Sequence, residues 1–310
     1  MKPSVVRAMG ISQLGSEKVT MFCGKGGVGK TTSAAATALH HAMSGTKTII
    51  ISTDFTPSLR DIFEVDSAAK PARVTDNLYL DEISYDNVKV LWDKRFGPQV
   101  YDLFSTFVEI DYQDFVGYVA TMLPGIRDEF MVDYIRELSE SGEYERVVWD
   151  TAPAGQTLGL LRMPSLMNNH LKPAFKIYSS LKSTHNLKRS VLGVIKDWEQ
   201  LSNKDMTFLK EQVQFNLVTI AEALAVRQLH DIFEEFKSYG LGVNHIVINQ
   251  VVEDADSPFL RRKAQLQQKY LTEVEGSYET GSTRVPLFPY EIKGVERLKE
   301  VERRLFSSAP

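Results

Sequence analysis

Short runs of apolar residues recur along the chain, each bounded by turn residues. They are rich in Val and Ile, and most do not alternate apolar with polar positions, which is typical of strands buried on both faces of a parallel sheet. Longer segments with helical periodicity lie between them, for example residues 221–239. This alternation predicts an α/β fold with a doubly wound, mostly parallel sheet. The runs cover residues 19–23, 48–52, 78–80, 147–149, 215–220, 245–248 and 285–288.

Two stretches, residues 86–139 and 165–203, interrupt this alternation. The first is rich in aromatic residues, and the second has no acidic residue between positions 166 and 196. We interpret both as helical insertions on one side of the sheet. The chain is therefore expected to form a single domain over residues 1–310 that carries an inserted helical subdomain.

The composition is ordinary for a globular protein, with 310 residues of which 43% are hydrophobic and 25% charged. Because 36 Lys and Arg face 40 Asp and Glu, the net charge is −4, which argues against a strongly basic nucleic-acid-binding protein. Cys23 is the single cysteine, which excludes an intrachain disulfide and a cysteine-rich metal cage. There is no signal-peptide pattern and no apolar run of about 18 residues, so we expect a soluble, cytoplasmic protein.

A glycine-rich loop follows the first predicted strand and fits the pattern G-x-x-x-x-G-K-[ST]. Its glycines let backbone N–H groups point at phosphate oxygens, and the helix expected over residues 32–43 presents its positive end to them. Lys30 would reach the β- and γ-phosphates, and the Thr31 hydroxyl would ligate Mg²⁺. The residues expected to bind nucleotide here are Gly24, Lys25, Gly26, Gly27, Val28, Gly29, Lys30, Thr31 and Thr32.

Two aspartates, Asp54 and Asp150, follow buried strands. Ligands of an open parallel sheet bind beyond the carboxyl ends of its strands, so both carboxylates should lie near the loop. An acidic residue at the end of a buried strand is the arrangement that holds Mg²⁺ in such sites, which we assign to Asp150. Asp54 could then orient the attacking water, although either residue could instead cap a helix. Lys25 could be an ordinary surface lysine or could contact a nucleotide.

With these motifs, the chain resembles the tail-anchored-protein targeting ATPases and their kin, the arsenical pump-driving ATPases, over nearly its whole length. The loop is similar to the family's deviant Walker A motif, which implies a homodimer in which Lys25 reaches the nucleotide of the facing subunit. The resemblance implies that Asp54, Lys25 and Lys30 are catalytic, and that Asp54 activates water. Residues 52–59 look like switch I, although Phe55-Thr56-Pro57 replaces the usual Pro-Ala-His.

Further signatures extend the resemblance. Residues 150–158 look like switch II, with Gln156 where His is common, and residues 124–129 match another family signature. Asn249, Pro286 and Leu287 resemble positions that hold adenine, and residues 289–294 continue that last signature. The resemblance implies ATP and Mg²⁺ as cofactors. Many members also carry a zinc-binding Cys-x-x-Cys where this chain has Ser257-Pro258-Phe259-Leu260, so we expect no zinc.

Apolar residues recur at helical spacing in the first insertion. They could pack against the sheet or form a groove that accepts an apolar helix. The resemblance favours a groove that binds client proteins, meaning membrane proteins with a hydrophobic helix. The acid-free run of the second insertion could be a solvated face or could touch anionic lipid headgroups. The candidate client-binding residues are Phe104, Phe107, Val108, Phe115, Tyr118 and Met122.

The leading hypothesis is an ATP-hydrolysing targeting factor that binds the transmembrane helices of tail-anchored membrane proteins and delivers them to a membrane. It would act as a homodimer, with transient contact to a membrane or a receptor and no nucleic acid. One alternative is a metalloid pump-driving ATPase, against which the single cysteine counts. A second alternative is a nucleotide-switched regulatory protein, like the partition and septum-placement ATPases.

Overall fold

The structure is a computed structural model and describes residues 17–54, 56, 58–83, 85–105, 109–122, 124–180 and 185–306. One eight-stranded sheet runs through it in the order β3-β4-β2-β5-β1-β6-β7-β8. All neighbouring strands pair in parallel except β3 and β4, which pair antiparallel at one edge. The strands are β1 (Val19–Gly24), β2 (Thr48–Ser52), β3 (Ala72–Arg73), β4 (Leu78–Glu82), β5 (Arg146–Asp150), β6 (Val213–Ile220), β7 (Val243–Val251) and β8 (Gly281–Pro286).

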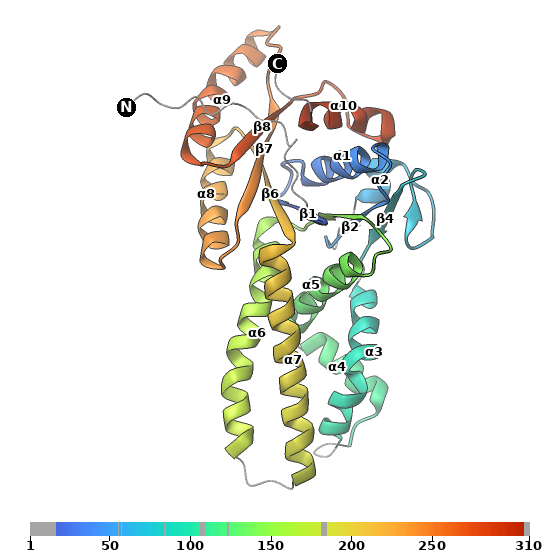
Figure 1. The fold of residues 1–310 in the computed structure, drawn as a ribbon. Helices are drawn as coiled ribbons and strands as arrows, with labels where there is room; N and C mark the ends of the chain where they lie inside the picture. The colour runs from blue at the N-terminus through green and yellow to red at the C-terminus, as the bar shows by residue number, and fades with distance from the viewer. Residues whose placement is uncertain are drawn as a thin grey trace.

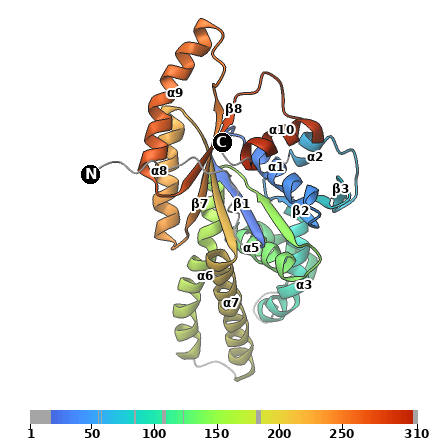
Figure 2. The same ribbon diagram turned by 45° about the horizontal axis from the view of Figure 1, so that its top comes forward.

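Helices cover both faces of the sheet (Figure 1). One face packs against α1 (Lys30–Met43), α2 (Leu59–Phe63) and α10 (Gly294–Phe306), and Figure 2 shows α1 and α10 lying together over it. The remaining helices belong to the other face or extend from it. They are α3 (Tyr85–Phe104), α4 (Tyr112–Met122), α5 (Pro124–Glu140), α6 (Ala154–Ser180), α7 (His185–Glu211), α8 (Ala223–Ser238) and α9 (Pro258–Ser277).

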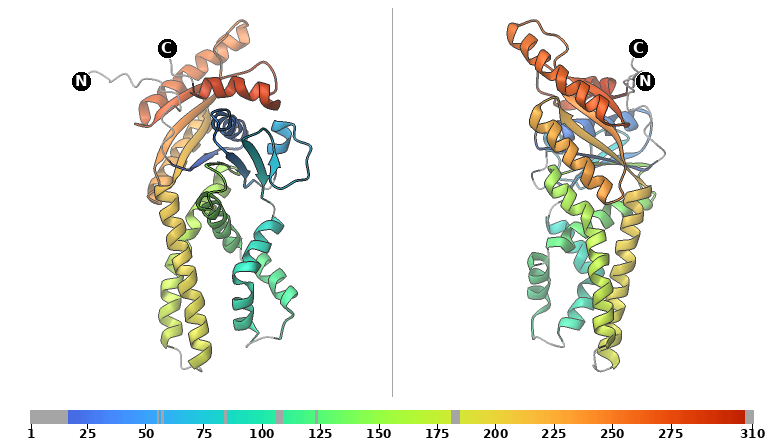
Figure 3. Two further views of the ribbon diagram at one scale, coloured as in Figure 1. Left: turned by 45° about the vertical axis from the view of Figure 1, so that its right-hand side comes forward. Right: turned by 90° about the vertical axis from the view of Figure 1, so that its left-hand side faces the viewer.

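The long helices α6 and α7 run side by side away from the sheet, and α3 and α4 extend in the same direction (Figure 3). These helices account for most of the two stretches that interrupt the strand pattern. Helix α5 returns the chain from this unit to the sheet, where Val132 and Ile135 are buried in the core. Among the described helices, none is both long and apolar enough to cross a membrane.

The predicted fold class is confirmed, since the sheet is mostly parallel and doubly wound. All seven predicted strands are present, with ends that differ by up to four residues. The two-residue strand β3 was not predicted, because so short a segment carries no periodic signal. Cys23 is fully buried at the end of β1, as expected for a core residue.

Three aromatic residues of the first insertion, Trp92, Phe96 and Phe115, are buried in the hydrophobic core. The Phe115 side chain is only 1% exposed, and its ring lies 5.4 Å from the ring of Tyr101. A role of Phe115 in client binding would therefore require α3 and α4 to separate. Phe104, Tyr118 and Met122 lie on described helices but their side chains are outside the description, as are Phe107 and Val108 altogether.

Candidate functional site

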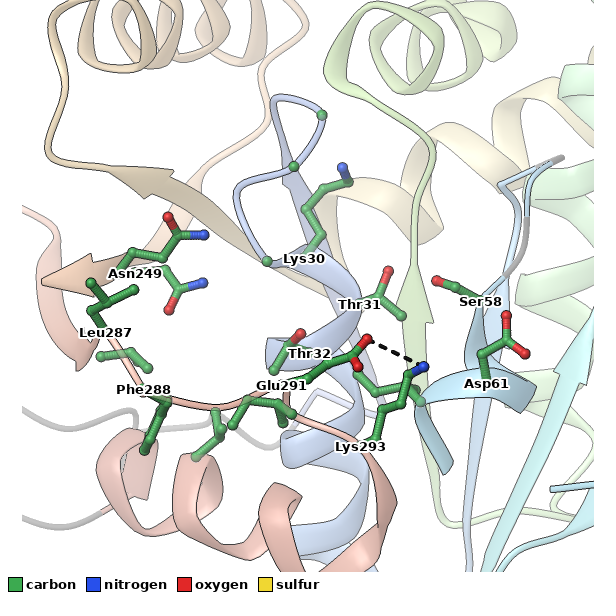
Figure 4. Close-up of a pocket in the computed structure, with 18 of the residues that line it drawn as sticks. Lys30, Thr31, Thr32, Ser58, Asp61, Asn249, Leu287, Phe288, Glu291 and Lys293 are labelled. Carbon is green, nitrogen blue, oxygen red and sulfur yellow. Dashed lines mark ion pairs between the residues drawn. The ribbon is translucent and has the colours of Figure 1, made fainter. Parts of the chain in front are cut away.

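A cavity of about 750 Å³ lies at the carboxyl ends of the central strands (Figure 4). Its wall combines the glycine-rich loop, the segment after β2, and the segments after β7 and β8. This is where an open parallel sheet binds ligands, because the loops that follow its strands converge there. The predicted site residues that line it are Gly26, Gly27, Gly29, Lys30, Thr31, Thr32, Asp54, Asn249, Pro286 and Leu287.

The glycine-rich loop curls around the side chain of Lys30, which is buried and donates a 3.1 Å hydrogen bond from Nζ to the carbonyl of Lys25. Gly29 has φ of 98°, a left-handed conformation that favours glycine. The Asn249 side chain presses against this turn and donates a 2.9 Å hydrogen bond from Nδ2 to the carbonyl of Val28. The loop is therefore held on both sides by contacts within the protein.

At the start of α1, the Thr31 hydroxyl donates a 3.0 Å hydrogen bond to Asp150 Oδ2. The Ser52 hydroxyl donates to the same oxygen at 3.4 Å, so the ends of β2 and β5 meet α1 at one carboxylate. Asp150 is 1% exposed, and burial raises its pKa to about 7 against the lowering effect of the Thr31 hydrogen bond. Its Oδ1 atom is buried and accepts no hydrogen bond within the described residues.

This environment fits a bound cation. This carboxylate receives neutral donors on one oxygen and none on the other within the described residues, and the nearby charge of Lys30 offsets only part of the effect of its burial. Hydroxyl and carboxylate oxygens are the donors that Mg²⁺ prefers. The oxygens of Thr31 and Asp150 fit the chemistry of the Mg²⁺ ligands predicted from the sequence, and that role stays a prediction; a nearby cation would favour the charged form of Asp150.

Asp54 lies beyond the end of β2, is half-buried and lines the cavity. Its negative charge contributes to the raised pKa of Asp150, which places the two carboxylates within electrostatic reach of each other. Asp54 Oδ1 accepts hydrogen bonds from the backbone N–H and the hydroxyl of Thr56. Neither aspartate caps a helix at its N-terminus in the structure, since Ser58 precedes α2 and Asp150 belongs to β5.

The other side of the cavity is built by Asn249 at the end of β7 and by Pro286 and Leu287 at the end of β8. Leu287 is 41% exposed, and its backbone N–H donates to the carbonyl of Val251 at 2.8 Å. Figure 4 shows the Asn249 and Leu287 side chains together, across the cavity from Thr31. This half of the cavity offers an apolar surface and an amide, which suit a planar base.

Part of the wall was not named as site residues from the sequence. Asp61 of α2 and Phe288 after β8 lie outside every segment that the motifs indicated. Ser58, Glu291 and Lys293 lie inside the segments 52–59 and 289–294, which were matched to family signatures without a role for these residues. Glu291 and Lys293 form an ion pair of 3.2 Å beside the opening. The signatures over residues 52–59 and 289–294 were the signals that could have indicated Ser58, Glu291 and Lys293.

Four other predicted residues lie at or behind the wall. Gly24, Val28 and Asp150 are buried beneath it, and Lys25 is half-buried in the loop outside the residues that line the cavity. Gln156 is exposed and lines a second cavity of about 410 Å³ on the opposite side of β5. In that cavity, Trp149 Nε1 donates a 3.0 Å hydrogen bond to the Thr53 hydroxyl, which ties the ends of β5 and β2 together.

The segment that replaces the zinc-binding Cys-x-x-Cys begins helix α9. Ser257 caps the helix by accepting a 3.2 Å hydrogen bond from the Leu260 N–H, and Phe259 is 74% exposed. Within the described residues, no group of three or more His, Cys, Asp or Glu side chains could hold a metal ion. The expectation that the protein uses no zinc stays a prediction.

The sequence profile of the anion-transporting ATPases matches residues 17–307, nearly the whole chain. The chain belongs to the anion-transporting ATPase family. The resemblance that the motifs indicated is thereby confirmed at the level of the family, and membership in this family supports nucleotide binding and ATPase activity.

Members of the anion-transporting ATPase family with similar sequences come from bacteria, plants and fungi. A putative arsenical pump-driving ATPase 2 of Aquifex aeolicus is 28% identical, over 93% of this chain and 99% of its own. ATPase GET3A of Arabidopsis thaliana is 29% identical, over 92% of this chain and 82% of its own. ATPase get3 of Schizosaccharomyces pombe is 28% identical, over 91% of this chain and 89% of its own.

Proposed function

We propose that this chain binds ATP and Mg²⁺ in the larger cavity and hydrolyses ATP there. The observation that carries the proposal is the 3.0 Å contact between Thr31 and Asp150, at the point where the glycine-rich loop enters α1. This contact brings together the two oxygen ligands that a metal–nucleotide complex requires. It also places them next to the loop that would hold the phosphates. Family membership and the convergence of the loop, Asp54 and Asn249 on one cavity support the same proposal.

Different parts of the cavity wall would bind the phosphates, the base and the attacking water. The backbone N–H groups of the loop and Lys30 bind the phosphates, and Lys30 exchanges its hydrogen bond to the Lys25 carbonyl for phosphate oxygens. Asn249, Pro286 and Leu287 hold the base. Asp54 accepts a hydrogen bond from the attacking water and so orients it toward the γ-phosphate.

Thr31 and Asp150 would hold Mg²⁺ at the mouth of the loop. When bound, Mg²⁺ supplies positive charge that neutralises the phosphate oxygens. Asp150 suits this position because its buried Oδ1 has no partner within the described residues. The need for Mg²⁺ is tested by measuring hydrolysis after chelation and after Mg²⁺ is restored.

The first test of the ATPase proposal is Asp54→Asn. We expect hydrolysis to fall at least about a hundredfold while ATP binding is kept. The neutral amide is a much weaker base than the carboxylate and cannot take a proton from the attacking water. Asp66→Asn, which changes an exposed carboxylate outside the cavity wall, is the matched control. Hydrolysis at the wild-type rate in Asp54→Asn would contradict the assignment.

We further propose that the protein is a cytoplasmic homodimer that shields a hydrophobic helix of a membrane-protein client and releases it at a membrane. Lys25, which lies in the loop but outside the cavity wall, would reach the nucleotide of the second subunit. The support is the resemblance to tail-anchored-protein targeting ATPases and the helical unit formed by α3, α4, α6 and α7. Hydrolysis would move the segments after β2 and β5, and with them α6, which begins four residues after β5.

Client binding is tested by capture. Asp54→Asn protein is co-expressed with a protein that ends in an apolar helix, and co-purification is measured with ATP and Mg²⁺. A matched charged helix is the control. Capture of the apolar helix alone supports targeting, whereas intact nucleotide binding without capture contradicts it. Nucleotide-dependent binding to bare liposomes or DNA would instead favour a regulatory switch.

A second candidate function is that of a metalloid pump-driving subunit, because several relatives carry that name. Thiolates are the ligands that soft metalloids require. Cys23 is fully buried, and burial raises the pKa of its thiol to about 12. We therefore expect no stimulation of ATP hydrolysis by arsenite or antimonite, and stimulation would revive this candidate.

A further inference from the structure

Among the residues that the structure describes, Thr56 is the one that donates hydrogen bonds to the carboxylate of Asp54. Asp54 Oδ1 accepts a 3.0 Å hydrogen bond from the backbone N–H of Thr56 and a 2.9 Å hydrogen bond from its hydroxyl. Both donors approach the same oxygen. Within the described residues, Oδ2 accepts no hydrogen bond from the protein, although Asp54 lines the cavity.

The two donors differ in which residue types at position 56 can supply them. Any residue except proline at position 56 supplies the backbone N–H, but only Ser or Thr at this place supplies a short hydroxyl donor as well. Thr56 is exposed, so water competes for its hydroxyl. The bond is nevertheless favoured because its acceptor is a carboxylate, and hydrogen bonds to ionised acceptors are stronger than neutral ones.

The backbone around Asp54 is fixed from the other side. Its N–H donates to the Ser52 hydroxyl at 3.3 Å, and that hydroxyl donates to Asp150 Oδ2 at 3.4 Å. The backbone N–H of Thr53 donates to the Asp150 carbonyl at 3.1 Å. The main chain of Asp54 is thus anchored to β5. Its side chain could still rotate, and the hydrogen bonds from Thr56 restrict that rotation.

We propose that Thr56 is a positioning residue: its hydroxyl fixes Oδ1 of Asp54, so that Oδ2 is the oxygen presented to the attacking water. This inference rests on the proposed ATPase function of the site. Thr56 also lines the cavity, but its hydroxyl donates to Asp54 Oδ1, so it acts on how well Asp54 is oriented when the phosphate is transferred. Its loss should therefore lower kcat and leave KM nearly unchanged.

The test compares two substitutions at one position. Thr56→Val has nearly the same shape but no hydroxyl, whereas Thr56→Ser keeps the hydroxyl. We expect Thr56→Val to lower kcat about fivefold with KM for ATP within about twofold of wild type. Thr56→Ser should stay within about twofold of wild type in both constants.

A binding readout separates positioning from general damage. Affinity for ADP with fluoroaluminate, a transition-state analogue, should weaken in Thr56→Val by about the same factor as kcat, while affinity for ADP alone is unchanged. In the Asp54→Asn background, Thr56→Val should add no further loss, because the carboxylate it positions is gone.

The outcomes are distinct. Thr56→Val at or above the wild-type rate, an equal loss in Thr56→Ser, or an additive loss in the double variant would each overturn the inference. If wild-type protein hydrolyses no ATP, or Asp54→Asn hydrolyses it normally, the proposed function itself fails and the inference falls with it. If Asp54→Asn is inactive but Thr56→Val is normal, the function stands and only the role of Thr56 is refuted.

Discussion

The hydroxyl of Thr31 donates a 3.0 Å hydrogen bond to Asp150 Oδ2 across 119 positions of the chain. The two residues meet because β5 lies next to β1 in the sheet and α1 follows β1 directly. Parallel strands that are neighbours end at the same edge, so the first turn of α1 comes to lie over the last residue of β5. This contact connects the phosphate loop to the candidate metal ligand.

The buried carboxylate of Asp150 should make the nucleotide-free protein less stable above neutral pH. Its pKa is raised by burial from 3.8 to about 7, so between these values the folded state binds more protons than the unfolded state. The free energy of unfolding therefore falls as the pH rises through this window, by at most about 4 kcal/mol.

Asp150→Asn should accordingly raise the melting temperature at pH 8 in the presence of EDTA and change it little at pH 4. The same variant should lose ATP hydrolysis with Mg²⁺. Thermal unfolding at both pH values measures the first effect, and Asp197→Asn on the exposed surface of α7 is the control. An equal shift at both pH values would show that the effect is not electrostatic.

Two glycines of the phosphate loop, Gly24 and Gly29, should not tolerate a methyl group. A Cβ at Gly24 would lie 2.2 Å from the backbone oxygen of Val218, and a Cβ at Gly29 would lie 2.1 Å from Asn249 Nδ2. Gly24→Ala should be the more damaging, because backbone yields less than the end of a side chain. We expect each to abolish nucleotide binding and to cost about 1–3 kcal/mol of stability.

Binding of a fluorescent ATP analogue and urea unfolding measure these effects. Gly276→Ala in α9 is the control, since a Cβ there would meet nothing within 4 Å. In the Gly29→Ala background, Asn249→Ala removes the clash but not the strain of the left-handed backbone. Full recovery of stability in that double variant would contradict the backbone argument.

Arg136 should be essential to the packing of α5 against α7. Its buried guanidinium donates a 2.7 Å hydrogen bond from Nε to Asp205, a 2.8 Å hydrogen bond to Glu140, and a further one to Asp133. Arg136→Met leaves Asp205 and Asp133 buried without this cation, which should cost about 3–5 kcal/mol.

Urea unfolding measures that loss. Arg297→Met, which breaks an exposed ion pair with Glu300, should cost less than about 1 kcal/mol. Comparable losses in the two variants would mean that burial does not determine how much these arginines contribute to the free energy of unfolding.

His245 should make the fold sensitive to acid. It is 6% exposed, shares a 2.8 Å hydrogen bond between Nε2 and the Thr283 hydroxyl, and has a pKa lowered by burial from 6.5 to about 4. The unfolded state therefore binds the proton first. The contribution of His245 to stability is complete above pH 6.5 and falls as the pH drops toward 4, by at most about 3 kcal/mol.

His245→Gln should flatten this dependence, while the exposed His230→Gln should leave it unchanged. Urea unfolding at pH 7.5 and pH 5 measures the difference. An unchanged slope in His245→Gln would place the acid sensitivity elsewhere.

The sequence alone was sufficient to predict seven of the eight described strands and the glycine-rich loop. Buried strands of a parallel sheet are continuous apolar runs, and the glycine-rich loop is a local motif whose residues act through their own backbone. Each can therefore be recognised from neighbouring residues. The edge strand Ala72–Arg73 was missed because two residues show no pattern, and its pairing depends on β4.

The amphipathic pattern around Phe115 shows where prediction from sequence ends. Helical spacing of apolar residues indicates a face but not its partner, and the structure places Phe115 against Tyr101 and Trp92. Likewise, nothing local indicated that Asp61 and Phe288 share one cavity wall, because α2 and the segment after β8 are distant in the chain.

What the sequence determined by itself is therefore local: which segments form strands and helices, and which residues carry the chemistry of a phosphate loop. Only the tertiary structure decided which side chains meet. The Thr31–Asp150 contact, the burial that raises the pKa of Asp150 and the support of the loop by Asn249 all arise from the order of strands in the sheet. Pairing between distant strands depends on packing across the whole domain, which no short stretch of sequence encodes.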